Sequence, residues 1–316
     1  MLSLPSDSTD TSQLCDMIEV SALCAHDGNA SLGDLESALE VTNYPEMERI
    51  DDAMPDEEEP EVAPPAVREA VSRKRDSVYT ELEERSKAAS GGYPFTLSNT
   101  GVLQLKSAWQ DYAAYTFCLC LSYRVWCGLP DNKPAQRLFE HLATTAAAGY
   151  IGGAGVRFGA PREGLPTGFT KAIAELCRLI GEGDGWSGTP PAMAKDDDVD
   201  VVAWVPFPDG LPGKLLMFGQ CTTAYDWSTG NKPKSLDPVG FCENWFKTQP
   251  EPMPVKSFFV PHVVSSTTWR ARIHHIRSTG LFFDRCRIAL HAQKRAGELT
   301  PHRDWAARQI TEFSSR

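Results

Sequence analysis

The feature that most constrains the fold of this chain is a pair of strand-like runs joined by a turn. The runs "VDVVAWVPF" at 199–207 and "KLLMFGQC" at 214–221 are rich in β-branched, aromatic and aliphatic residues, most of which favour strands. The "PDGLPG" between them is dense in turn-forming residues. A β-hairpin that turns at Asp209 and Gly210 pairs positions whose numbers add up to about 419. Asp200 is therefore expected opposite residue 219 or 220, at the open end of the hairpin.

Helical and extended patterns are mixed around this hairpin. Their order predicts an α/β fold in which a mixed, partly antiparallel central sheet is flanked by helices and preceded by a small helical N-terminal region. The other expected elements are a helix at 134–153 that begins at Pro134, an extended entry at 153–169, an amphipathic helix at 170–183, a short helix at 238–246, a strand at 255–264, and a helix, a "TG" turn and a last strand within 270–292.

The chain ahead of this core divides by composition. Residues 1–48 are predicted to form a small helical module, because two short amphipathic patterns flank "HDGNAS" and Ser31 stands at an N-cap position. Residues 49–67 are acidic, rich in proline and nearly free of large apolar groups, which is typical of a linker. Residues 68–130 are predicted to be a helical region, with a charged helix followed by a second helical stretch from about residue 99. Residues 131–316 are predicted to form the core domain.

The charge of the chain is unevenly distributed. Residues 1–90 hold 22 acidic and 7 basic side chains, whereas the remaining 226 residues hold 20 acidic and 24 basic ones. The acidity therefore belongs to the N-terminal third, and the mildly basic remainder permits a polyanionic partner.

The cysteines and the apolar runs indicate a cytoplasmic protein. The nine cysteines are odd in number and form no CxxC motif, and no positively charged start precedes an apolar segment as in a secretory signal. We therefore expect reduced, mostly buried thiols. The one long apolar stretch, "AAYTFCLCLSYRVWCGL" at 113–129, is interrupted by Arg124 and is interpreted as a buried helix, so no membrane association is expected.

The open end of the predicted hairpin combines a carboxylate with an amide. Asp200 and Gln220 are expected to be near neighbours there. With a third oxygen donor from a helix, such a pair suits a hard divalent cation such as Mg²⁺. Such a cation lowers the pKa of water and neutralises charge that develops on a phosphate, which is what phosphodiester hydrolysis requires.

The same residues resemble a known family. "VDVVAW" followed by "LLMFGQC" is similar to the core hairpin of PD-(D/E)xK nucleases, which have the restriction-endonuclease-like fold, and in particular to the Mrr-like branch, where Gln replaces Glu in the second half-motif. The upstream "FEHL", the "RLIGEG" helix and the "SFFVPH" strand occur in the expected order. The similarity covers roughly residues 134–290 and extends to prokaryotic proteins of this type associated with defence against foreign DNA.

The resemblance implies roles for individual residues. Asp200 would be the aspartate that binds Mg²⁺ or Mn²⁺, Gln220 the second ligand through its carbonyl, and Glu140 the third, although Glu163, Glu175 and Glu182 compete for that role. The lysine expected two positions after Gln220 is replaced by Thr222, which leaves Lys232 or Lys234 to supply the positive charge from the following loop.

Two functions follow from these observations. The first is a metal-dependent nuclease, with DNA favoured as substrate, in which Arg270, Arg272 and Arg277 contact the phosphate backbone. The second is a catalytically degenerate subunit that keeps the fold and binds nucleic acid or a partner protein in a larger complex. The Asp200–Gln220 pair favours the first and Thr222 favours the second. The structural alternatives are a strand-start aspartate at 200 and a solvated helix face for the arginines. For Asp196, Asp197 and Asp198 we expect an exposed loop. Most nucleases of the resembled fold work as dimers or in assemblies, so a second copy is a further expected partner.

Overall fold

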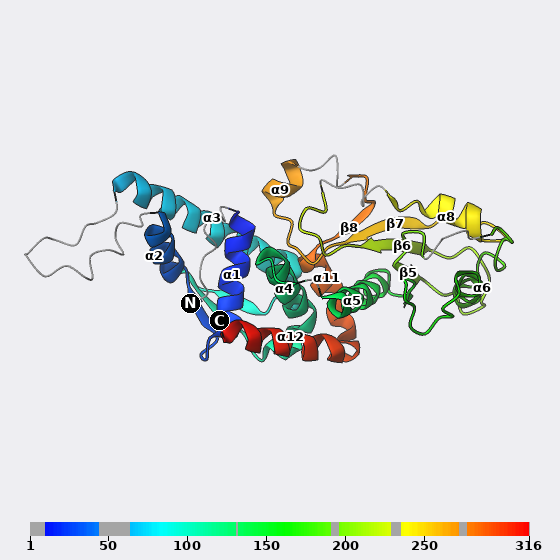
Figure 1. Cartoon of the computed structure of the whole chain (residues 1–316), viewed down its shortest axis with the longest axis horizontal. Helices are drawn as coiled ribbons and strands as arrows, with labels where there is room; N and C mark the ends of the chain where they lie inside the picture. Colours follow the sequence, from blue (N-terminus) through cyan, green and yellow to red (C-terminus); the bar gives the residue numbers. More distant parts are fainter. Residues whose placement is uncertain are drawn as a thin grey trace, which may run out of the picture.

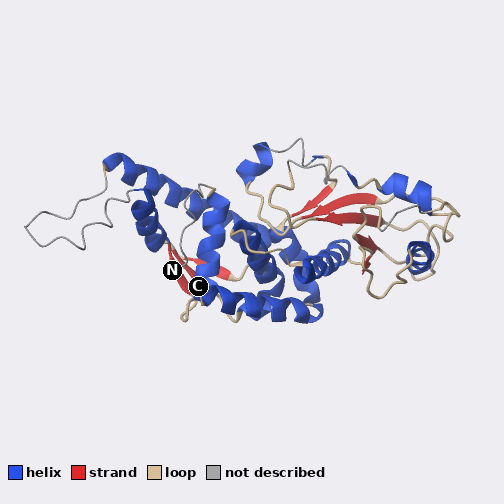
Figure 2. Ribbon diagram, viewed as in Figure 1, coloured by secondary structure: helices blue, strands red, loops and turns tan. Residues whose placement is uncertain are grey.

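The computed structural model describes residues 10–43, 64–130, 132–190, 196–228, 235–271 and 277–315, with the backbone alone for 41–43. Most helices gather in one half of an elongated molecule, and a five-stranded sheet occupies the other half (Figures 1 and 2). The described helices are α1 (Thr11–Cys24), α2 (Leu32–Asn43), α3 (Pro65–Ala89), α4 (Ala113–Trp126), α5 (Lys133–Ile151), α6 (Phe169–Ile180), α8 (Pro238–Trp245), α9 (Ser266–Ala271), α11 (Arg285–Ala292) and α12 (Thr300–Ser314), with short 3₁₀ turns at Ser90–Gly92, Trp109–Tyr112 and Gln293–Glu298.

The strands form two sheets. The larger sheet has the order β4-β5-β6-β7-β8, in which β4, β5 and β6 are antiparallel neighbours and β6, β7 and β8 are parallel ones. A small antiparallel sheet of order β1-β3-β2 lies in the helical half. The strands are β1 (Asn29–Ser31), β2 (Phe95–Leu97), β3 (Val102–Leu105), β4 (Ala154–Arg157), β5 (Val201–Trp204), β6 (Leu216–Cys221), β7 (Val255–Phe259) and β8 (Leu281–Phe283).

The larger sheet is covered by helices on both faces. Alternation along β5 and β6 sends Val201 and Met217 into the core that α5 and α11 share, and it sends Val202 and Phe218 into the core beneath α6 and α8. The result is a three-layer arrangement in which helix α5 supports the hairpin on one side. The predicted α/β class with a mixed central sheet is confirmed.

Most of the predicted elements are present. The helix expected at 134–153 is α5, the amphipathic one is α6, and the hairpin strands are β5 and β6. The N-terminal pair of helices is α1 and α2, and Ser31 caps α2 because its hydroxyl accepts a hydrogen bond from Gly33 N at 3.0 Å. The charged helix is α3, which ends at Ala89. Of the linker predicted at 49–67, residues 49–63 lie outside the described residues, and residues 65–67 belong to the start of α3.

Three stretches differ from the prediction. The stretch from residue 99, expected to be helical, begins with strand β3, and helix α4 starts only at Ala113. Strands of three residues, such as β1 and β2, are too short to show a period in the sequence. The last predicted strand is limited to β8, because Asp284 caps a new helix by accepting from Arg287 N at 3.0 Å. The C-terminal helix α12 was not predicted.

A cluster of buried charges joins the two halves of the molecule. Asp16 and Glu19 on α1 bind Arg85 on α3, with Arg85 Nη1 2.7 Å from Asp16 Oδ1 and 2.9 Å from Glu19 Oε2. Arg285, at the start of α11, donates to Asp16 Oδ2 at 2.7 Å and to Glu19 Oε2 at 3.3 Å. Glu81 completes the set through Arg85 Nη2, at 2.9 Å. Residues far apart in sequence are thus held together in the interior.

The cluster satisfies its own charges. The hydroxyls of Tyr93 and Tyr115 donate to Glu19 Oε1 at 2.9 and 2.8 Å. Burial would raise the pKa of Asp16, but Arg285 and Arg85 outweigh it and lower that pKa to about 2. Around the cluster runs one hydrophobic core that contains side chains from α1, α2, α3, α4, α5, α11 and α12. All four regions predicted from composition therefore contribute residues to a shared interior, apart from the part of the linker that lies outside the description.

The apolar run at 113–129 forms the buried helix α4, as predicted. No described helix combines the length and the apolar character needed to cross a membrane. All nine cysteines are free thiols, and seven of them are buried. This agrees with the expectation of reduced, packed cysteines.

Candidate active site

The register of the hairpin brings Asp200 to the end of strand β6. Val201 pairs with Gly219, so the paired residue numbers add up to 420, one more than the predicted 419. This register places Asp200 opposite residue 219 or 220, as expected. Asp200 N also donates to Gly219 O at 2.9 Å. Asp200 and Val201 therefore both lie opposite Gly219 of β6, which is the arrangement of a β-bulge.

The backbone around Asp200 fixes its carboxylate. Oδ2 accepts a hydrogen bond from Cys221 N at 2.7 Å. The Asp200 carbonyl accepts from Phe158 N at 2.7 Å and from Gly159 N at 3.2 Å, so the segment after β4 is held against it. Asp200 is half-buried. An ionised carboxylate bound by a backbone N–H in this way is a well-oriented oxygen donor.

Glu140 on helix α5 shares the space beside Asp200. A Cβ atom added to Gly159 would lie 2.8 Å from Glu140 Oε2 and 3.0 Å from Asp200 Oδ1. The two carboxylates therefore approach the same point of the backbone, where only a glycine leaves room for both. Of the glutamates that competed for the predicted role, Glu140 is the one found at this position. Glu163 contacts His141, Glu175 pairs with Arg178, and Glu182 binds the backbone of Gly213 and Lys214.

Arg157 lies against Glu140 and was not singled out from the sequence. Its Nε donates to Glu140 Oε2 at 2.7 Å, and its side chain is 1% exposed. Burial raises the pKa of Glu140 above its usual value, because it outweighs the opposing effect of Arg157. An arginine that is buried at the end of a strand is unusual, because arginine is seldom fully buried. This is the feature of the sequence that could have pointed to Arg157.

Gln220 has a different set of partners. Its side chain is 3% exposed, and its Nε2 donates to Asp198 Oδ1 at 3.1 Å and to Ser235 Oγ at 3.0 Å. The reason is the period of the strand: Gln220 follows Leu216 and Phe218 on the face of the sheet toward α6 and α8. The bulge places Asp200 beside Glu140 on the α5 face. The structure therefore pairs Asp200 with Glu140, and Gln220 with Asp198.

The three aspartates ahead of Asp200 form a turn that is largely exposed, as predicted. Asp196 Oδ2 accepts from Ala160 N at 3.1 Å, and Asp197 Oδ2 accepts from Trp245 Nε1 at 2.7 Å. Asp197 and Asp198 both have a positive φ, of 51° and 63°, a conformation that aspartate tolerates better than most residues. Each aspartate thus ties the turn to a different neighbouring element.

Of the predicted sources of positive charge, Lys232 and Lys234 lie outside the described residues. Thr222 is buried and serves the turn after β6: its N–H donates to Phe259 O at 3.1 Å, and its hydroxyl accepts from Ala224 N at 3.3 Å. Arg157 is the buried cation that the described part of the chain places in contact with Glu140.

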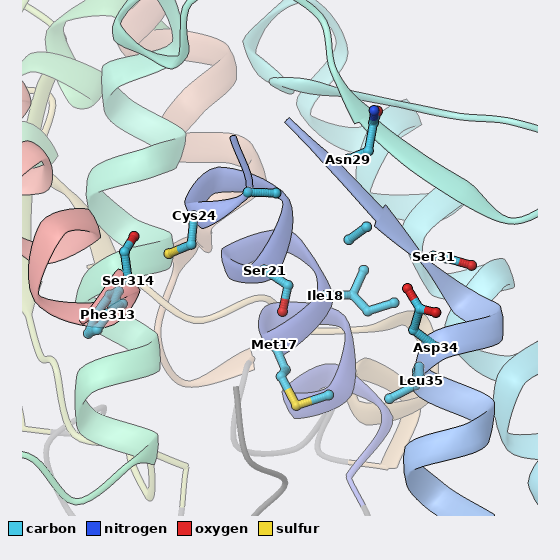
Figure 3. A pocket seen from close by; sticks show the side chains of 12 residues that line it. Met17, Ile18, Ser21, Cys24, Asn29, Ser31, Asp34, Leu35, Phe313 and Ser314 are labelled. Atoms are coloured by element: carbon cyan, nitrogen blue, oxygen red, sulfur yellow. The ribbon is translucent and has the colours of Figure 1, made fainter. Parts of the chain in front are cut away.

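A groove of about 390 Å³ opens beside the pair. Glu140 and Gln136 of helix α5 form one wall, and the turn from Cys221 to Ala224 forms another. The groove therefore gives a ligand access to the Glu140 side of the pair. A separate groove of about 400 Å³ lies between α1, β1, α2 and the end of α12, as Figure 3 shows, and none of the predicted site residues lines it.

The predicted nucleic-acid arginines belong to another surface. Arg270 lies in the last turn of helix α9 and is exposed, Arg277 is exposed, and Arg272 lies outside the described residues. Arg270 lines a groove of about 330 Å³ together with Arg287 and residues of helix α3. The residues that line this groove are all different from those that line the groove at Glu140.

Two carboxylate oxygens are a small ligand set. Within the described ranges, no group of three or more His, Cys, Asp or Glu side chains is arranged to hold a metal ion. Mg²⁺, however, is commonly held by one or two carboxylates, with water and substrate phosphate completing its shell. The Asp200–Glu140 pair fits that kind of site, and Gln220 is not positioned by its partners to join it.

Comparisons with protein-family models, with curated proteins and with solved structures find no match to this chain.

Proposed function

We propose that this protein is a metal-dependent nuclease that hydrolyses phosphodiester bonds, with DNA as the favoured substrate. The observation that carries the proposal is the convergence of Asp200 Oδ1 and Glu140 Oε2 at Gly159, at the open end of the β5–β6 hairpin. Two oriented carboxylates beside an open groove are typical of hydrolytic sites that use Mg²⁺ or Mn²⁺.

The topology supports the same proposal. Helix α5 is followed by strand β4, helix α6 and strands β5 and β6, and β4, β5 and β6 pair as antiparallel neighbours; helix α8 and the parallel strand β7 come next. This order agrees with the one that the resemblance to restriction-endonuclease-like proteins implies. Asp200 stands immediately before β5, the second strand of the sheet. We extend the proposal to that fold family and to a cytoplasmic role in prokaryotic defence against foreign DNA, with a second copy or a defence-complex protein as partner.

In the proposed reaction the chain supplies geometry and charge. Cys221 N and the bulge fix the Asp200 carboxylate, and Arg157 fixes that of Glu140. A divalent cation bound between them would lower the pKa of water and offset the charge that develops on the phosphate. The groove beside Glu140 would admit the nucleic-acid backbone. Arg137, exposed one turn earlier on α5 and lining a separate groove with His141 and Glu163, would attract the phosphates by its charge.

A second function, a degenerate nuclease-fold subunit that binds nucleic acid or a partner protein, is favoured by one observation. Thr222 stands at the position of the expected lysine, and its hydroxyl is engaged in the turn after β6. In this case the groove would bind a ligand without cleaving it.

The deciding experiment is a cleavage assay on plasmid, linear and single-stranded DNA and on RNA, with Mg²⁺, Mn²⁺ or EDTA. Asp200→Asn and Glu140→Gln keep the shape of each side chain and are expected to lower the rate at least about 100-fold. Asp209→Asn, at the other end of the same hairpin and exposed, is the matched control and should cleave like the wild type.

Cleavage that survives EDTA or the Asp200→Asn substitution would contradict the proposed site. The absence of cleavage by the wild type, with nucleic-acid binding unaffected by Asp200→Asn, would establish the binding-subunit function instead.

A further inference from the structure

Arg157 differs from Arg85 and Arg285, the two arginines of the buried charge cluster. In Arg85 and Arg285 all three guanidinium nitrogens donate hydrogen bonds, to carboxylates and to backbone carbonyls. In Arg157, Nε binds Glu140 and Nη1 donates to Pro161 O at 2.8 Å, but the buried Nη2 has no hydrogen-bond partner among the described residues.

A buried donor without a hydrogen-bond partner destabilises the folded state, because the group has lost its water and gained nothing in exchange. Native proteins keep few such groups, and those they keep are concentrated where function sets the position of the side chain. Arg157 is the last residue of β4 and pairs with Val201. It therefore stands immediately before Phe158 and Gly159, whose backbone N–H groups bind the Asp200 carbonyl. Its guanidinium thus lies beside one carboxylate, and its backbone leads to the other.

We propose that Arg157 is the positioning residue of the site: it holds the Glu140 carboxylate at Gly159 and provides the fixed positive charge that Thr222 does not. This inference rests on the proposed nuclease function. An arginine stays protonated and its planar fork sets the direction of its hydrogen bonds, so Arg157 orients Glu140 and offsets charge without exchanging a proton.

The proposed role of Arg157 predicts different effects on cation binding and on the rate of cleavage. Removing the positive charge of Arg157 lowers the electrostatic repulsion toward a bound cation, so cation binding does not weaken for that reason. The loss of orientation at Glu140, however, slows cleavage. Removing the Asp200 carboxylate weakens both cation binding and cleavage. A residue that served folding alone would change neither quantity in a variant that remains folded.

The test compares Arg157→Met, Arg157→Lys and Asp200→Asn with the wild type. Mn²⁺ binding is measured by calorimetry without nucleic acid, cleavage under single-turnover conditions, and folding by circular dichroism. We expect Arg157→Met to cleave about 100-fold more slowly, while its Mn²⁺ dissociation constant rises less than that of Asp200→Asn. Arg157→Lys, which keeps the charge but not the fork, should lie between Arg157→Met and the wild type. Asp200→Asn should lose both binding and cleavage.

Each other outcome has a definite meaning. If the wild type cleaves and folded Arg157→Met cleaves equally fast, the inference about Arg157 is overturned and the proposed function stands. If the wild type neither binds Mn²⁺ nor cleaves, both are overturned. If neither Arg157 variant folds, the residue is structural and the inference is wrong.

Discussion

Gly159 is the residue at which the two candidate carboxylates meet the backbone. Gly159→Ala would place a methyl group within 3.0 Å of both Glu140 Oε2 and Asp200 Oδ1. We expect the carboxylates to separate, cleavage to fall about 100-fold and Mn²⁺ binding to weaken, because small displacements of catalytic groups have large effects on rate. Cleavage assays and calorimetry check this.

Gly168→Ala provides the matched control. Gly168 lies in the same connection between β4 and β5, has an ordinary φ of −72°, and has open space where its Cβ would be. This variant should behave like the wild type. Equal behaviour of the two alanine variants would show that the space at Gly159 is not used by the site.

At the residue scale, sequence reasoning singled out Asp200, its register and Glu140, but not the surroundings of Gln220 or the contact of Arg157 with Glu140. The hairpin register follows from turn chemistry, which is local. The direction of the Asp200 side chain depends on the bulge opposite Gly219, and no residue type in the sequence specifies that bulge. The role of Gln220 was inferred from the position opposite Asp200, yet the bulge places the two side chains in different surroundings.

At the scale of elements, the buried charge cluster connects α1, α3 and α11. Arg285→Met would leave Asp16 and Glu19 in the interior with Arg85 as their remaining arginine. Removing one partner from a buried ion pair costs about 3–5 kcal/mol, so we expect the free energy of unfolding to fall by that amount. Urea denaturation followed by circular dichroism measures the change.

The comparison for this substitution is Arg178→Met. Arg178 forms an exposed ion pair with Glu175 on α6, at 2.6 Å, and such surface pairs contribute little to stability because water screens them. A loss at Arg285 no larger than the loss at Arg178 would mean that the buried cluster is not formed in solution.

Element prediction succeeded where the pattern was long. The hydrophobic periods of α5 and α6 and the apolar runs of β5 and β6 span enough residues to identify their type. The three-residue strands β1, β2 and β8 depend on pairing with partners elsewhere in the chain. Helix α11 was not predicted because it follows the apolar strand β8 almost directly, and only the cap at Asp284 separates the two.

At the scale of the whole molecule, two buried histidines make stability depend on pH. Burial, reinforced by Arg285, lowers the pKa of His262 to about 4, and burial lowers that of His302 to about 4 as well. In the unfolded chain both take up protons near pH 6.5. Between pH 6.5 and 4 the unfolded state therefore binds more protons, and stability is lost as the pH falls, by roughly 1.4 kcal/mol per pH unit for each histidine.

The measurement is the free energy of unfolding in urea at several pH values between 6.5 and 4. His302→Gln keeps a donor for Leu138 O, which His302 Nε2 binds at 2.9 Å, and removes one titrating group. We expect the free energy of unfolding of this variant to fall less steeply with decreasing pH, because one of the two titrating histidines is absent. A free energy that stays constant over this range would show that both histidines titrate normally in the folded protein.

Whole-molecule organisation was the least predictable level. Composition divides the chain into successive regions, but Asp16 binds Arg85 and Arg285 across separations of 69 and 269 residues. Nothing in local spacing links such partners, because their meeting depends on how α1, α3, α4 and α11 pack. The same holds for Arg157 and Glu140, which meet only after β4 has folded beside α5.

The charge cluster also limits how a chain like this one can be inherited in parts. A gene fusion that joined the sheet-bearing half to a different N-terminal segment would leave Arg285 in an apolar interior without Asp16 and Glu19. Such a recombinant would survive selection only if codon 285 changed at the same time, or if the new segment brought carboxylates to the same positions. Descendants of this chain should therefore exchange Asp16, Glu19, Arg85 and Arg285 together or not at all.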